Sequence, residues 1–165
     1  MTVDGIFGVG TEKKILEVVA SGEEPVDKNA GTGVTVDAAP GTFWEEIPDF
    51  KRSEFRCTCG RCGGFPVEPD EKMVRTVQAI RDRLGIPVSI VDAGGSGVRC
   101  PEHNAAVGGV WNSEHLYGRA ADLHANCSPE EMYAAAEAVM GKTGGIGKYS
   151  WGIHVDVGKY SRWCG

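Results

Sequence analysis

Two histidines and one aspartate in the second half of the chain are the residues best suited to chemistry, because together they could hold a metal ion. His115 and Asp122 lie on either side of Gly118, where the backbone can turn sharply, so a hairpin would bring the imidazole and the carboxylate together. His154 lies in a stretch, 152–157, in which apolar and polar residues alternate as in a strand. Three nitrogen and oxygen ligands with a fourth position open are typical of a catalytic zinc. The alternative is that each histidine is an ordinary hydrogen-bonded residue.

Six cysteines, at positions 57, 59, 62, 100, 127 and 164, are a second group with chemical potential. The close spacing of Cys57, Cys59 and Cys62 suits a structural zinc, for which Cys100 or Cys164 would have to supply the fourth ligand. The even number favours disulfides if the protein works outside the cytoplasm, and we expect at least one that involves residues 57, 59 or 62. Reduced thiols in the core are the third alternative.

Regular elements that could position these residues are visible in the local patterns. An amphipathic helix is predicted over 71–84, a strand over 88–91, a helix with a capping box over 129–140, and two short strands within 144–158. Helices and strands mix without a regular βαβ rhythm, which indicates an α+β fold with a small antiparallel sheet that carries the metal site.

Composition excludes two classes of partner. The formal net charge of −6 would repel a phosphate backbone, so nucleic acid is not expected to bind. No apolar run approaches the roughly 18 residues that a membrane span needs. We expect a protein without a membrane span that works as a monomer.

The motif around the histidines resembles a known family. Ser113, His115, Gly118, Ala120 and Asp122 follow the pattern S-x-H-x-x-G-x-A-x-D, and His154 follows on a later strand. Residues 98–157 thus resemble the VanY-type zinc D-Ala-D-Ala carboxypeptidases and their L-Ala-D-Glu endopeptidase relatives, which include phage endolysins. The segment RCPEHNAAVGG, 99–109, is also similar to that family, and the resemblance runs from about residue 50 to the end. It implies a hedgehog or D,D-peptidase-like fold.

The resemblance also implies residue roles. His115, Asp122 and His154 would be the zinc ligands. Arg99 would hold a substrate carboxylate or polarise its carbonyl, as a planar guanidinium can. Ser113 would contact substrate, or bond to the backbone at the turn.

One departure from the family leaves the general base open. Many relatives carry an acid three residues before the last histidine ligand or a histidine two before it, where this chain has Trp151 and Gly152. Asp156 is two residues past His154 and so on the same strand face. It is expected to act as the catalytic base, or alternatively to orient a zinc-bound histidine.

The N-terminal part is expected to be separate from the peptidase domain. Residues 3–11 and a predicted helix over 11–20 resemble the C-terminal half of a peptidoglycan-binding repeat. We therefore expect a partial wall-binding segment at 1–24, a linker at 25–42 and a zinc peptidase domain at 43–165. No secretory signal is visible at the start, so either another export route or a longer parent chain is expected.

The resemblance leads to one preferred function and two alternatives. The preferred function is a zinc metallopeptidase that hydrolyses peptide bonds in peptidoglycan stem peptides, as a carboxypeptidase or an endopeptidase, outside the cytoplasm or at the cell wall. The alternatives are an inactive zinc-binding module that recognises wall or partner, which the missing acid at Trp151 favours, and a structural protein of a phage virion.

Overall fold

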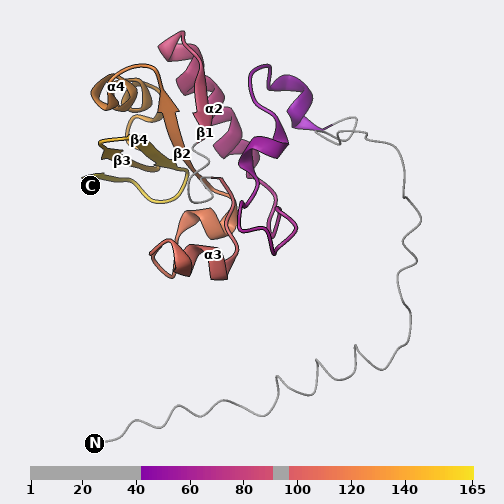
Figure 1. Cartoon of the computed structure of the whole chain (residues 1–165). Coiled ribbons are helices and arrows are strands. Elements are labelled where there is room, and N and C mark those ends of the chain that lie inside the picture. The colour runs from indigo at the N-terminus through magenta and orange to yellow at the C-terminus, as the bar shows by residue number, and fades with distance from the viewer. Residues whose placement is uncertain (1–41, 91–96) are drawn as a thin grey trace, which may run out of the picture. The chain divides into compact units, whose positions relative to one another are not determined.

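A computed structural model describes residues 42–90 and 97–165 of the chain (Figure 1). The segment expected at 1–24, with its helix over 11–20, and almost all of the linker expected at 25–42 lie outside the described residues. Within the described part, no helix has the length and apolarity needed to cross a bilayer.

The centre of the fold is a sheet of five strands in the order β1-β2-β4-β3-β5. The strands are β1 (Val88–Ile90), β2 (Ala120–Ala125), β3 (Gly145–Tyr149), β4 (Gly152–Asp156) and β5 (Ser161–Cys164). The α+β class is confirmed, and the first four strands in that order pair antiparallel as expected. The sheet is mixed because β5, which was not predicted, pairs parallel with β3. The chain reverses after β4, but both edges of β4 are already paired, with β2 and with β3. Strand β5 therefore pairs with the open edge of β3.

In residues 42–90 and 97–165, three α-helices and three short 3-10 helices lie around the sheet. They are α2 (Glu71–Leu84), α3 (Pro101–Ala106), α4 (Pro129–Met140), η1 (Phe43–Glu46), η2 (Arg52–Phe55) and η3 (Glu114–Tyr117). Helix α2 begins where Asp70 accepts a hydrogen bond from Met73 N and ends at Gly85 in the left-handed conformation. Helix α4 begins with a reciprocal capping box between Ser128 and Glu131. Both helices have the bounds that the sequence predicts.

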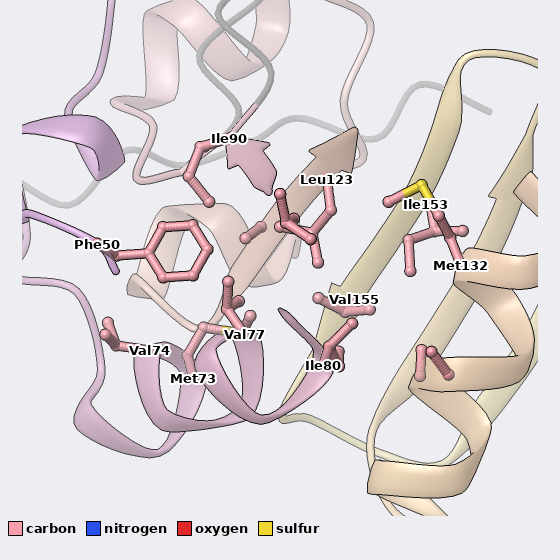
Figure 2. Packing of buried hydrophobic residues seen from close by; sticks show 14 of the residues in the cluster. Phe50, Met73, Val74, Val77, Ile80, Ile90, Leu123, Met132, Ile153 and Val155 are labelled. Carbon is pink, nitrogen blue, oxygen red and sulfur yellow. The ribbon is translucent and has the colours of Figure 1, made fainter. Parts of the chain in front are cut away.

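Side chains from α2 and α4 pack on one face of the sheet. Figure 2 shows Val77 and Ile80 of α2 close to Leu123 and Val155, and all four belong to one buried cluster. Because successive strand residues point to opposite faces, Asp122 and His154, which alternate with these apolar residues in β2 and β4, point to the other face. The packing of the core thus determines which face of the sheet carries the polar residues.

Gly118 ends a helical turn, and the hairpin expected around it is not formed. His115 lies in η3, Gly118 follows with φ 68°, and β2 begins two residues later. The N–H of Arg119 donates to Glu114 O, which closes the turn as in other left-handed helix ends. A glycine in the left-handed conformation suits both a hairpin and a helix end, so the sequence pattern alone does not distinguish the two.

Two glycines with the same backbone conformation give a matched test of this turn. An added Cβ at Gly118 would lie 2.3 Å from Glu68 O, whereas at Gly85, with φ 67°, it would meet nothing within 4 Å. Gly85→Ala should therefore lower the free energy of unfolding by only about 1 kcal/mol, the cost of the left-handed conformation. Gly118→Ala should lower it by roughly 2–4 kcal/mol, since backbone must also move. Urea unfolding of both variants measures the difference, and equal losses would contradict the close packing of Gly118 on Glu68.

Candidate metal centre

The structure brings the three predicted ligands together. His154 Nδ1 lies 2.9 Å from Asp122 Oδ1 and 3.3 Å from His115 Nε2, and His115 Nε2 lies 3.4 Å from Asp122 Oδ1. Asp122 and His154 are direct cross-strand partners in β2 and β4. A tetrahedral zinc with bonds of about 2.0–2.1 Å requires ligand atoms about 3.3 Å apart. The residues therefore fit a single zinc ion held by three protein atoms.

Each histidine is oriented by a hydrogen bond on its other nitrogen. His115 Nδ1 donates to Gly97 O at 2.6 Å, which leaves Nε2 to face the other donors. His154 Nε2 faces Asp156 Oδ2 at 3.3 Å, which leaves Nδ1 on the side of Asp122. Such bonds fix the tautomer and ring orientation of metal-binding histidines.

Asp156 lies behind His154, seen from the other donors. Its Oδ1 accepts hydrogen bonds from the backbone N–H of Gly145 at 3.1 Å and of Gly158 at 2.8 Å, and the residue is only 6% exposed. The imidazole of His154 stands between this carboxylate and Asp122. Of the two roles expected for Asp156, this geometry supports the orientation of a ligand.

Arg99 forms a buried ion pair with the third donor. Its guanidinium donates to Asp122 Oδ2 at 2.7 Å, and the two side chains are 11% and 12% exposed. The expected position of Arg99 at the site is thus observed, together with a contact to a metal donor that the sequence did not predict. Asp122 is held by this pair in the same way that each histidine is held by its outer hydrogen bond.

Burial and hydrogen bonding act against each other in these groups. Burial opposes ionisation of Asp122, but its close contacts with His115 and His154 outweigh it and hold the pKa of the carboxyl well below its usual range. Burial also opposes a charge on His154, yet its bonds to Asp122 and Asp156 raise the pKa of that imidazole to about 8. Burial lowers the pKa of His115. A positive charge is therefore favoured on His154, between the carboxylates of Asp122 and Asp156, and disfavoured on His115.

The donors line a cleft of about 710 Å³ that is open on one side. Other residues along it include Ser113, Glu114, Tyr149, Trp151, Lys159 and Trp163. Ser113, expected to contact substrate, is 9% exposed at the start of η3. A cleft of this size is within the range that holds small ligands.

Positions 151 and 152, at which many members of the similar family carry an acid or a histidine, hold Trp151 and Gly152 in this chain. Trp151 is 42% exposed and stacks on Tyr149 with ring centroids 5.0 Å apart. Gly152 has no room for a side chain, since a Cβ would lie 2.2 Å from Leu123 O. Neither position can supply a carboxylate or an imidazole to the cleft.

Glu114 is a carboxylate of the cleft that the sequence reasoning missed. Its side chain is 25% exposed, and Oε2 accepts from Arg119 Nε at 2.8 Å and from the second guanidinium nitrogen at 2.7 Å. The signal that could have found it is its place next to His115, in a turn that must face the site.

The cysteines differ from the preferred expectation. In the described part of the chain, which includes all six, no disulfide is present. Instead, the sulfur atoms of Cys57, Cys59, Cys62 and Cys100 all lie within 4.8 Å of one another. Cys100 is far from the other three in the sequence. It is brought close to them because it precedes α3, and His103 of this helix contacts Cys57 in the loop that holds the other three.

Comparison with known proteins gives one family. A family model described as peptidase M15 matches residues 48–156, which include Arg99 and all three metal donors. A search of the curated proteins found no match.

The role of Asp156 can be tested by metal binding. Asp156→Asn should lower zinc affinity about 10–100-fold, because the charge that orients His154 is lost. Glu114→Gln makes the same chemical change on a cleft carboxylate that pairs with Arg119 instead of a donor, and it should keep wild-type affinity. Competition with a chromophoric chelator measures both. Unchanged affinity in Asp156→Asn would contradict the orienting role and favour a direct catalytic one.

Proposed function

The chain belongs to the peptidase M15 family, and on that premise we propose that this metallopeptidase uses zinc to hydrolyse the stem peptides of bacterial peptidoglycan. The observation that carries the proposal is the convergence of His115, Asp122 and His154 on one point of an open cleft. The protein would act outside the cytoplasm or at the cell wall, where that substrate is, and it would act there as a monomer.

The donor set supports a catalytic rather than a structural metal. Three side chains face the point, and the remaining side opens to the cleft, as in zinc enzymes that keep a position for water or substrate. A zinc ion bound there would supply a Lewis acid for the peptide carbonyl and would lower the pKa of bound water. The protein residues hold the three donors rigid through Gly97, Asp156 and Arg99.

Two basic side chains among the acids of the cleft support a substrate with carboxylates. Arg99 and Lys159 both line it, and stem peptides carry carboxylates at D-Ala and D-Glu. Arg99 is close enough to Asp122 to act beside the scissile bond, where a guanidinium could bind a substrate carboxylate or the oxyanion that forms during hydrolysis. Lys159 could pair with a second carboxylate. Carboxypeptidase and endopeptidase cleavage both remain within this proposal, including the activity of a phage endolysin.

Proton transfer requires a carboxylate that faces the cleft. We propose Glu114 for this step, because its side chain is 25% exposed, whereas Asp156, which also lines the cleft, lies behind His154 and is only 6% exposed. Glu114 lines the cleft beside His115, and Arg119 fixes its orientation through two hydrogen-bonding nitrogens. It would accept a proton from attacking water and pass it to the leaving amine.

The activity is tested on purified muropeptides at neutral pH. Zinc-loaded protein should release D-Ala or split L-Ala from D-Glu, and mass spectrometry distinguishes the two products. His154→Ala should remove both zinc and activity.

One observation favours a second function, recognition without catalysis: Trp151 stands where relatives carry an acid. Protein that holds zinc and binds muropeptides without cleaving any of them would support that function instead.

Arg99 gives a sharper test of the cleft. Arg99→Ala should lower kcat/KM by ~100-fold or more, the scale of one lost charged contact in the transition state. Arg99→Lys, which keeps the charge without the planar fork, should recover part of that loss. Arg83→Ala, on the exposed side of α2, serves as a control and should keep wild-type activity. Because Arg99 contacts Asp122, zinc content is measured in each variant, and loss of zinc in proportion to activity would contradict a direct role in catalysis.

A further inference from the structure

The four converging cysteines lie outside the cleft and have no part in the proposed hydrolysis. We propose that Cys57, Cys59, Cys62 and Cys100 hold a second, structural zinc as a tetrathiolate site. Cys59 Sγ lies 3.3 Å from Cys62 Sγ and 3.8 Å from Cys100 Sγ. All four sulfurs lie within 4.8 Å of one another. Zinc–sulfur bonds of about 2.3 Å in a tetrahedron place sulfurs about 3.8 Å apart, so the group already has the dimensions of a closed site.

Convergence on one point distinguishes a metal site from disulfides. A disulfide joins two sulfurs at about 2.05 Å and gives no reason for a second pair to meet them. Here Cys59 contacts both its neighbour in the C-x-x-C segment and Cys100, which is 41 residues away. Four thiols that share one centre are the pattern expected of zinc sites with four cysteine ligands, in which two ligands come from one loop and others from elsewhere in the fold.

N–H groups surround the sulfurs as they do around metal thiolates. Arg61 N donates to Cys59 Sγ at 3.3 Å, and His103 N donates to Cys100 Sγ at 3.4 Å. The ring nitrogen Nδ1 of His103 lies 3.2 Å from Cys57 Sγ. Such donors stabilise negative sulfur and orient the ligands. Neutral thiols in an apolar core would not need them.

The surrounding chain needs a cross-link of this kind. Between η2 and α2, the residues after Phe55 and before Glu71 form no helix or strand. Their apolar support is a small cluster, separate from the main core, of Cys57, Val98 and Cys100 with Cys59, Cys62, Phe65 and Val67 packed against it. Irregular segments of this length are uncommon without function or extra support. A bound zinc would supply folding free energy that so few apolar side chains cannot.

Metal analysis tests the proposal independently of any activity. Wild-type protein purified with zinc alone should contain about two zinc ions per chain, one for each donor group. Cys59→Ser and Cys100→Ser should each lose about one, whereas Cys127→Ser and Cys164→Ser, which change cysteines outside the group, should lose none. Equal zinc content in all four variants would overturn the site.

A second measurement does not depend on whether the cysteine variants fold. The double variant His115→Ala, His154→Ala removes the cleft site and keeps every cysteine, so its remaining zinc should show a shell of sulfur alone at about 2.3 Å by X-ray absorption. A shell of nitrogen and oxygen, a Cys59–Cys62 disulfide in freshly purified protein, or iron in place of zinc would each overturn the proposal. Wild-type protein that contains this sulfur shell and yet cleaves no muropeptide would count against the proposed function alone.

Discussion

The arrangement of the cleft depends on the register in which β2 and β4 pair. Asp122 lies opposite His154, and a shift of one residue in either strand would turn the donor of that strand toward α2 and α4. Leu123, Ile153 and Val155 prevent that shift, since each is fully buried in the core on the helix side and burial of such a side chain contributes about 1.5–3 kcal/mol. The hydrophobic effect, more than any metal, therefore sets two of the three donors in place.

Local signals account for the parts of the fold that the sequence predicted. The ends of α2 and α4 follow from Asp70, Gly85 and the Ser128 capping box, which act within one turn of the helix. Strand β5 was not predicted because its position depends on which edges the other strands have already filled. Short-range patterns cannot contain that information.

In the site, too, features set by local sequence patterns could be predicted, and contacts between residues distant in sequence could not. The donor types and the position of Asp156 on the face of His154 could be predicted, since motif spacing and strand alternation are local properties. The bond from Arg99 to Asp122 and the arrival of Cys100 beside Cys59 could not, because they depend on the path of the chain through loops. The expected disulfides are not seen in the described residues, and an even number of cysteines carries no information about how many of them meet at one point.

The short segment 97–100 contacts both groups of candidate metal ligands. Gly97 O accepts from His115, Val98 N donates to Phe55 O, Arg99 holds Asp122, and Cys100 belongs to the thiol group. Whatever orders this segment lowers the conformational entropy that the other ligand group must lose when it binds. If both groups bind metal, their occupancy would be thermodynamically linked, and by reciprocity each ion would strengthen binding of the other by the same factor. A chain of this design would pass from metal-free to fully loaded over a narrow range of zinc concentration.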